Sequence, residues 1–486
     1  MNLIERILRF SICNRLLVIM LTLFAAGYGV FALKHLPIDA VPDITNQQVQ
    51  INSIALGLSP YDVEKQVTFP IENALAGIPG LESTRSISRS GFSQVTAIFK
   101  ENIDIYFARQ QLSEKLLEAK EFLPESVEPK MGPISTGLGE VYMWSVDYKH
   151  PGGIGAEIEN HAPGWQSDGH YLTPEGLKLK THVELASYLR TVQDWIIRPQ
   201  LKTIAGIADI DSIGGYVRQY HITPHPQKMI SLGISFSDLI EALEYNNLSV
   251  GAGYIDLKNE SYIVKADNRV KNHEEIMQIV IKTKDGIPIR VKNVAEVGIG
   301  EEPRTGSASK DGYETVIGTA MMLIGSNSRT VASAVHEKLQ QISRNLPNDI
   351  TVTPILNRTK LVDATIKTVV LNLSEGALLV ILVLFLMLNN FRAAAITASV
   401  IPLAVLMTAI GMVKFKISGN LMSLGALDFG LIVDGAIIIT ENCLRKLAER
   451  QRHLKRLLSL HERQEEIILA SKEMIQPTVF GQAIII

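Results

Sequence analysis

Cysteine is scarce in this sequence, and neither sign of charge is in marked excess. The 486 residues include only two cysteines, which excludes a disulfide framework, and no Cys/His cluster has the spacing of a structural zinc site. The formal net charge is −3, from 47 Lys and Arg against 50 Asp and Glu. That balance gives no support for a nucleic-acid partner.

Long apolar runs are missing from the middle of the chain and concentrated near its ends. Residues 34–365 are rich in charged and turn-forming residues. At about 1.5 Å per residue, each outer run can cross a hydrocarbon core of ~30 Å. The sequence therefore predicts a multi-pass membrane protein with a large polar region. The predicted spans are residues 16–33, 369–388, 393–413 and 421–443.

Basic residues orient these spans. Arg6, Arg9 and Arg15 precede the first span and place the N-terminus in the cytoplasm. A cleaved signal peptide remains the alternative to the first span. Residues 1–15 are expected to form an interfacial amphipathic helix. Alternation then puts residues 34–365 outside the cell membrane. Lys414 and Lys416 run against this topology.

The segment after the fourth span alternates charged and apolar residues at helical spacing. Residues 444–475 are therefore predicted to form a cytoplasmic amphipathic helix. Residues 477–486 are the apolar start of a fifth span with no stop signal. We accordingly expect the sequence to be incomplete.

The polar region has the pattern of small α+β units. Residues 47–130 read as strand, helix, two strands and helix, which is a split βαβ order. The stretch from Pro70 to Leu81 is similar to that from Pro199 to Ile210, at a constant offset of 129. Chance could produce this match; if it is a repeat, the region contains duplicated modules. Further strands are predicted at 216–223 and 254–265, and helices at 235–246 and 328–345.

Three acidic residues lie in the fourth apolar span, namely Asp428, Asp434 and Glu441. A carboxylate inside a membrane costs several kcal/mol (roughly 2.5–3.5 on insertion scales) and commonly marks an ion pathway or proton relay. Asp428 and Asp434 are about 9 Å apart along the helix axis and some 120° apart around it. Asp434 and Glu441 share one face. A buried ion pair remains the alternative for the two aspartates, and a solvated role for Glu441.

The stretch Asp428-Phe-Gly-Leu-Ile-Val-Asp434-Gly-Ala, followed by Glu441-Asn442, resembles the fourth transmembrane helix of the resistance-nodulation-division (RND) transporters. More narrowly, it is similar to their heavy-metal efflux branch, the cobalt-zinc-cadmium and copper-silver pumps. The segment from Leu36 to Asp43 and the ending from Pro477 to Ala483 are also similar to that branch.

This resemblance implies a bacterial inner-membrane proton antiporter that works as a homotrimer. A periplasmic adaptor protein and an outer-membrane channel would complete a tripartite pump. Asp428 and Asp434 match the proton-relay aspartates, and Glu441 matches an extra acidic position of the branch. Family members carry a second copy of this arrangement, so the chain looks like an N-terminal half. The implied subdomains are a first porter at 47–134, a second porter at 135–215 and 291–340, and a docking subdomain at 216–290.

Glu140 is the one metal-binding candidate. It follows a Gly-rich stretch where the similar zinc and cobalt pumps carry glutamate, and a carboxylate suits borderline divalent cations better than copper(I) or silver. A solvated glutamate at a strand end is the alternative. His150, His161, His170 and His182 fall in one loop that could collect metal, or could simply be polar and mobile. No cofactor is predicted.

The leading hypothesis is proton-driven export of divalent metal ions such as zinc, cobalt or cadmium, by a transporter and not an enzyme. Export of organic compounds or lipids by the same fold is the second hypothesis. The third is a membrane-anchored periplasmic scaffold or sensor. The intramembrane acids argue against a scaffold, because such a protein would gain nothing from their cost.

Overall fold

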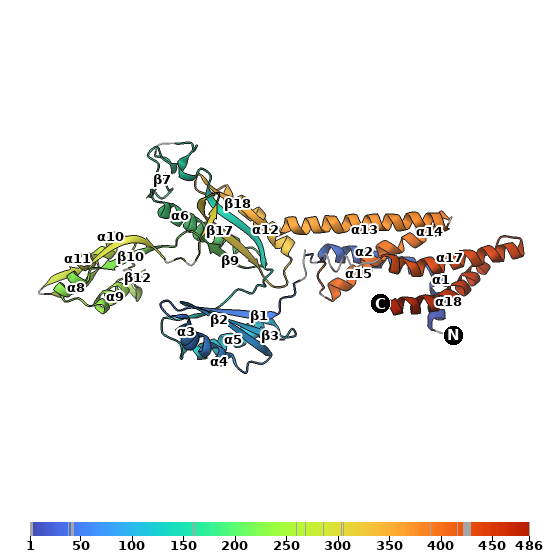
Figure 1. The fold of residues 1–486 in the computed structure, drawn as a ribbon, viewed down its shortest axis with the longest axis horizontal. Coiled ribbons are helices and arrows are strands. Elements are labelled where there is room, and N and C mark those ends of the chain that lie inside the picture. The colour runs from blue at the N-terminus through green and yellow to red at the C-terminus, as the bar shows by residue number, and fades with distance from the viewer. Residues whose placement is uncertain are drawn as a thin grey trace.

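The computed structural model describes residues 3–485, apart from 37, 40–42, 159, 160, 259, 268, 285, 303, 305, 389, 416 and 421–428. The molecule is elongated, with helices at one end and three α/β units at the other (Figure 1). Both chain termini lie at the helical end. The long helix α13 (Arg358–Leu388) runs from the α/β part along the helical part.

The first α/β unit is a four-stranded antiparallel sheet with helices on one face. Its strand order is β2-β3-β1-β4, the arrangement of a split βαβ unit. Alternating apolar residues such as Val49, Ile51 and Val95 point from the strands into a buried core. The strands are β1 (Gln47–Ile54), β2 (Leu81–Arg89), β3 (Phe92–Phe99) and β4 (Pro129–Met131).

Capping residues mark where the helices of this unit begin. Ser59 accepts a hydrogen bond from the Asp62 backbone N–H and precedes Pro60 at the first helical position, and Asp104 caps α5 (Ile105–Lys120) in the same way. Such caps satisfy backbone donors that a helix leaves free. The first helical segment comprises α3 (Pro60–Val63), the π-helical turn η1 (Glu64–Thr68) and α4 (Phe69–Leu75).

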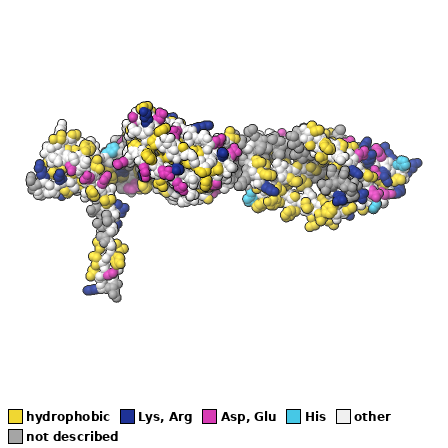
Figure 2. All heavy atoms as spheres, turned by 90° about the horizontal axis from the view of Figure 1, so that it is seen from below, with side chains coloured by type: hydrophobic (Ala, Val, Ile, Leu, Met, Phe, Trp, Pro, Cys, Tyr) yellow, Lys and Arg dark blue, Asp and Glu magenta, His cyan; other side chains and the backbone are white. Residues whose placement is uncertain are grey.

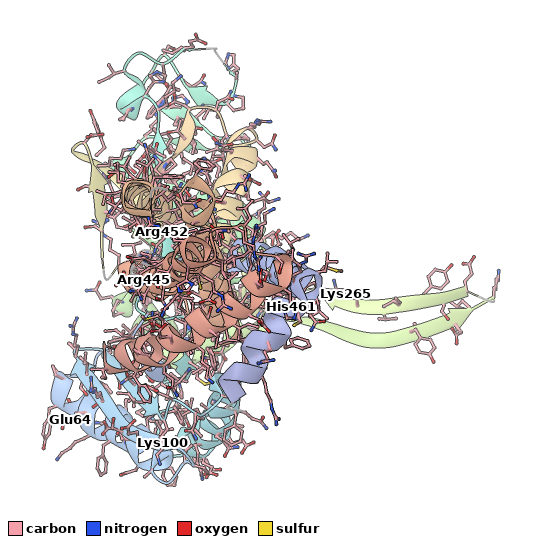
Figure 3. The ribbon with its side chains drawn as sticks, turned by 90° about the vertical axis from the view of Figure 1, so that its right-hand side faces the viewer. Glu64, Lys100, Lys265, Arg445, Arg452 and His461 are labelled. Carbon is pink, nitrogen blue, oxygen red and sulfur yellow. The ribbon has the colours of Figure 1, made fainter. Side chains whose placement is uncertain are left out.

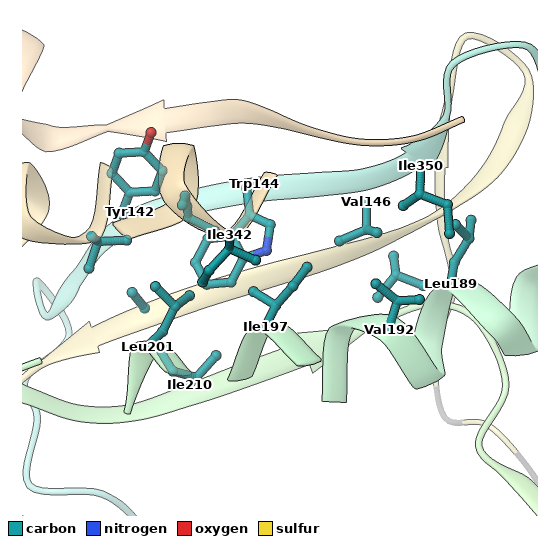
Figure 4. Close-up of a cluster of buried hydrophobic side chains, with 14 of the residues drawn as sticks. Tyr142, Trp144, Val146, Leu189, Val192, Ile197, Leu201, Ile210, Ile342 and Ile350 are labelled. Carbon is teal, nitrogen blue, oxygen red and sulfur yellow. The ribbon is translucent and has the colours of Figure 1, made fainter. Parts of the chain in front are cut away.

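The second unit repeats this plan. Strand β17 lies between β9 and β5, and β5 pairs with β18, so the order β9-β17-β5-β18 matches β2-β3-β1-β4. The core behind the sheet contains Trp144, Ile197 and Ile210 (Figure 4). The strands are β5 (Glu140–Tyr148), β9 (Ile207–Ile213), β16 (Ala308–Lys310), β17 (Tyr313–Met322) and β18 (Ile350–Asn357). The helices are α6 (His182–Thr191), η3 (Val192–Ile197), α7 (Arg198–Leu201) and α12 (Ser328–Ser343).

The similarity at an offset of 129 residues falls at the same place in both units. Each has a π-helical turn, η1 or η3, followed by a helix with proline in its first turn. Each then turns at a glycine in the left-handed region, Gly77 at φ 86° and Gly206 at φ 89°. A residue with a side chain would be strained there. The two units therefore share one structural plan.

A small insertion separates β5 from α6 in the second unit. It contains η2 (Pro151–Gly153) and a three-stranded sheet of β6 (Gly164–Trp165), β7 (Tyr171–Leu172) and β8 (Lys178–Leu179). The indole N–H of Trp165 donates to the Asp349 carboxylate at 2.8 Å, and His150 contacts the same carboxylate. This insertion, which holds His150, His161 and His170, is thus tied to the second sheet.

The third unit is inserted between β9 and β17, where the first unit has only a tight turn at Gly91. It has its own core, built around Met229, Leu239 and Val291. Its strands are β10 (Arg218–Pro224), β13 (Val280–Lys284), β14 (Ile287–Arg290) and β15 (Ala295–Glu301). Its helices are α8 (Pro226–Leu232), α9 (Phe236–Tyr245), α10 (His273–Gln278) and α11 (Val291–Val294).

Two predicted boundaries in this region are wrong. β15 pairs with β10, so the third unit extends to Glu301 and not to residue 290. β18 pairs with β5, so the second unit extends to Asn357, beyond the predicted limit of 340. Strand pairing between residues far apart in the chain sets both limits, and no local pattern reports such pairing.

The single strand predicted at 254–265 is also wrong. The structure has a hairpin of β11 (Ser249–Leu257) and β12 (Glu260–Asp267). Figure 3 shows this hairpin extending away from the body of the molecule, with Lys265 near its base. Its exposed apolar side chains include Tyr254 and Ile263.

The helical part contains three helices that are long and apolar enough to cross a membrane, within the residues that the structure describes. They are α2 (Arg15–His35), α13 up to Leu386, and the segment Phe391–Lys414. Figure 2 shows apolar side chains over much of this end and charged ones gathered at its extremity. The segment Phe391–Lys414 comprises α14 (Phe391–Ala398) and α15 (Val400–Lys414). The other helices of this part are α1 (Leu3–Cys13), α17 (Phe429–Leu454) and α18 (Leu460–Ile485).

The predicted second span, residues 369–388, lies within α13, which begins earlier, at Arg358 directly after β18. One helical prediction is wrong. The single helix predicted at 444–475 is instead two helices joined by a turn, because Ser459 and Glu462 exchange capping hydrogen bonds that start α18. α18 then continues through Pro477, so the expected start of a fifth span is the second part of an existing helix.

Candidate functional site

Two of the three acidic residues predicted to act together lie on α17 (Phe429–Leu454). Asp434 and Glu441 are on its described part, whereas Asp428 lies outside the described residues. Asp434 and Glu441 are seven positions apart, which is about two helical turns and about 10 Å along the axis. They therefore project from the same face of α17.

α17 is packed against four other helices. Ile437 lies against a buried cluster formed by Leu384 of α13, Ala394 of α14 and Ile401 of α15. The Thr397 hydroxyl of α14 donates to the Thr440 hydroxyl at 3.4 Å. These contacts fix the turn of α17 between the two acids.

Gly435 brings α18 close to α17 next to Asp434. A Cβ at residue 435 would lie 2.8 Å from the Gln482 Nε2 atom and 3.2 Å from the Thr478 Cγ2 atom. A small residue in an apolar helix permits such an approach. Sequence reasoning missed this contact, although a glycine within an apolar helical run was a signal for it.

The carboxylates of Asp434 and Glu441 are exposed in this chain. Within the described residues, neither forms an ion pair. The face of α17 that carries them is therefore a surface of the helical part, while the opposite side faces α13, α14 and α18. A carboxylate on such an apolar surface can bind a proton, a cation or a partner side chain.

A polar network links α17 and α18 one residue beyond Glu441. The Asn442 side chain is 4% exposed; it donates to the Ala470 carbonyl at 3.0 Å and to Glu473 at 3.4 Å. Arg445 donates to the Asn442 amide oxygen at 2.8 Å. Hydrogen bonds from Asn442 and Lys446 hold the pKa of Glu473 below its usual value. No local sequence pattern predicts this network, because its members lie about 30 positions apart.

Glu140 begins β5 at an irregular joint of the second sheet. It pairs with Met321 of β17 next to a register shift, and its side chain is exposed. Ser135 donates to the Met322 carbonyl at 2.8 Å, and Met322 N–H donates to the Gly139 carbonyl at 2.7 Å. The Gly-rich stretch is therefore held against β17, which fixes the position of Glu140.

No group of three or more potential His, Cys, Asp or Glu ligands surrounds Glu140 or any other point within the described part of the chain. Three of the four histidines lie beside separate carboxylates: His150 beside Asp349, His170 beside Asp168 and His182 beside Glu314. The structure does not bring them together as a metal site. Glu140 alone could supply one oxygen ligand.

Comparison with known proteins gives consistent matches along nearly the whole chain. A family model described as the AcrB/AcrD/AcrF family matches residues 7–486. The nickel and cobalt resistance protein CnrA of Cupriavidus metallidurans is 58% identical over 482 residues, which are 99% of this chain and 45% of that protein. The nickel-cobalt-cadmium resistance protein NccA of Alcaligenes xylosoxydans xylosoxydans is 57% identical, with the same coverage.

The fold has a counterpart among solved structures. An X-ray crystal structure of a heavy metal efflux pump matches with a TM-score of 0.76 and 30% sequence identity. The match covers 98% of this chain and 42% of that pump. The chain thus spans less than half the length of the proteins that it matches.

Proposed function

This chain belongs to the AcrB/AcrD/AcrF family of RND transporters, and on that premise we propose that it forms the first half of a proton-driven exporter of divalent heavy-metal cations. Its two relatives named above are nickel and cobalt resistance proteins by their names. Nickel therefore joins zinc, cobalt and cadmium as a proposed substrate.

The observation that carries this proposal is the position of Asp434. Its carboxylate lies on an apolar helix that is packed into a helical unit by Ile437 and Gly435. Such an acid is costly in a membrane unless it is protonated or paired. A proton that crosses the membrane through it would release about 2.3 kcal/mol per 100 mV of membrane potential. We assign Asp428, Asp434 and Glu441 to a proton relay. The exposed face of α17 that carries Asp434 and Glu441 would be covered by the further part of the protein that the longer relatives possess.

We place the helical part in the bacterial inner membrane. α2, α13 and the segment Phe391–Lys414 supply three spans, and α17 supplies the fourth. Arg6, Arg9 and the basic residues after Glu441 favour a cytoplasmic location for the α1 end and the α17–α18 turn. The three α/β units then project into the periplasm, the first two as porter subdomains and the third as a docking subdomain.

The metal ion is a substrate of this proposed pump. A glutamate oxygen at residue 140 suits borderline divalent cations such as nickel, cobalt and zinc. The other ligands would come from parts that the described residues do not include. By the family's pattern, the pump would be a homotrimer joined to a periplasmic adaptor and an outer-membrane channel.

Replacing Asp434 by Asn in the complete gene product tests the relay. The amide has nearly the same shape but cannot bind and release a proton in the physiological range. We expect nickel and cobalt resistance of a metal-sensitive host to fall to the level of cells without the pump. Membrane abundance and trimer formation should stay normal. The control is Glu449→Gln, a change at an exposed acid farther along α17. Full resistance in the Asp434→Asn strain would refute the relay.

A further inference from the structure

One residue between α2 and β1 contacts three distant parts of the chain. The Asp39 carboxylate accepts a hydrogen bond from the Ser328 hydroxyl at 2.8 Å. The same oxygen lies 3.5 Å from the Arg358 Nε atom. The Asp39 backbone N–H donates to the Gly419 carbonyl at 3.0 Å, and Ile38 forms a parallel bridge with Gly419.

Two partners of Asp39 begin helices, and the third lies between two helices. Ser328 is the first residue of α12, the helix that covers the second sheet. Arg358 is the first residue of α13 and directly follows β18 of that sheet. Gly419 lies between α15 and α17. Asp39 therefore joins the segment that leads to the acid-bearing helix with the second α/β unit.

This joint is tightly packed. The Arg358 and Asp39 side chains are 11% and 25% exposed, and Ser328 is buried. Arg358 also donates to the Leu138 carbonyl at 3.3 Å. A Cβ at Gly419 would lie 2.9 Å from the Leu36 Cδ2 atom. The carboxylate also sits at the start of α12, where the helix dipole favours negative charge. A shift of Gly419 would therefore push on Asp39 and, through it, on α12 and α13.

Arg358 faces a second carboxylate at this joint. Burial raises the pKa of Asp43, but hydrogen bonds from Thr45 and Thr136 and the charge of Arg358 outweigh burial, so its pKa lies below the usual value. The charge of Arg358, the first residue of α13, thus acts on two acids in the segment before β1. Contiguous networks of packed side chains, hydrogen bonds and ion pairs can carry energy between distant sites, and Asp39 lies within such a network.

We propose that Asp39 is a positioning residue that couples movement of the segment at Gly419 to movement of the second α/β unit. This inference rests on the proposed proton-driven export. Protonation of the acids on α17 would shift the segment at Gly419, and Asp39 would pass that shift to Ser328 and Arg358. The second unit, which carries Glu140, would then change its position toward the metal.

The test measures nickel transport and proton movement separately. The complete gene product is reconstituted into lipid vesicles with a pH-sensitive dye and a metal-sensitive dye inside, and a pH gradient and nickel ions are applied. We expect Asp39→Ala to lower nickel transport at least tenfold while proton movement continues, so that the nickel-to-proton ratio falls. Ser328→Ala, a smaller change, should lower the same ratio to an intermediate value and serves if Asp39→Ala does not fold.

The matched control is Asp363→Asn. Asp363 pairs with Arg329 at 2.8 Å between α13 and α12, but both side chains are about half exposed. Its nickel-to-proton ratio should equal that of the unchanged protein. If nickel transport and proton movement fell in parallel in both Asp39→Ala and Ser328→Ala, or if the nickel-to-proton ratio stayed unchanged in both, the coupling role of Asp39 would be overturned. The proposed function would still stand. Absence of proton-linked nickel movement in the unchanged protein would refute the proposed function as well.

Discussion

Gly29 of α2 lies directly against Leu406 of α15. A Cβ at residue 29 would lie 2.6 Å from the Leu406 Cβ atom and 3.1 Å from its carbonyl oxygen. The neighbouring Gly27 on the same helix has no atom within 4 Å of a built Cβ. The two glycines therefore differ in what a methyl group would meet.

We expect Gly29→Ala to destabilise the helical part, because α2 and α15 must separate to admit the methyl group. Overpacking of this kind typically costs about 1–3 kcal/mol. Gly27→Ala should be neutral or slightly stabilising, since alanine favours helix. Thermal unfolding of the two purified variants in detergent measures the difference. Equal unfolding temperatures for both would contradict the close packing.

The second prediction concerns the core of the second unit. The indole N–H of Trp144 on β5 donates to the Gln193 amide oxygen on η3 at 2.9 Å, and both residues are buried. Gln193→Leu removes the acceptor and leaves the indole donor unpaired, at a cost of about 1–3 kcal/mol. Hydrogen exchange of the β5 and η3 amides should become faster. Gln200→Leu, at an exposed site of α7, is the control and should leave exchange unchanged.

The third prediction concerns pH at the turn between α17 and α18. Hydrogen bonds from Arg456, with help from the Ser459 backbone, lower the pKa of Glu462 from 4.5 to about 2. A lowered carboxyl pKa stabilises the turn above the ordinary pKa, and that contribution is lost as pH falls from 4.5 toward about 2. We expect Glu462→Gln to speed amide exchange at residues 455–462 at pH 6, relative to the unchanged protein. The difference should shrink as pH falls through that window; a difference independent of pH would count against the assignment.

The fourth prediction concerns metal choice. Glu140→Ala should reduce resistance to nickel, cobalt or zinc, with protein level preserved, because the residue is exposed and its removal leaves no cavity. Glu82→Ala is the control, since Glu82 is an exposed strand residue of the first unit. Dose–response curves of growth against each metal measure this resistance. An unaltered metal profile in Glu140→Ala would remove this residue from the proposed substrate path.

Local patterns determined much of this protein. The apolar runs around Leu16–Leu33 and Ala393–Val413, the alternating residues of β1 and the caps at Ser59 and Asp104 each specify an element through nearby chemistry. The acids of the α17 region are visible for the same reason, because a charge in an apolar run stands out whatever the tertiary structure. The resemblance to RND transporters also rested on contiguous residues, and the family match agrees with it.

Only the tertiary structure decided which distant segments meet. The sequence did not indicate that β15 would pair with β10, that α17 and α18 would fold back on each other at residues 455–459, or that Asn442 would bind Glu473. Asp39 and Ser328 are 289 positions apart. Their hydrogen bond exists because two covalently remote elements pack together, and the free energy of such a contact depends on the whole arrangement around it and not on the residues beside it in the chain.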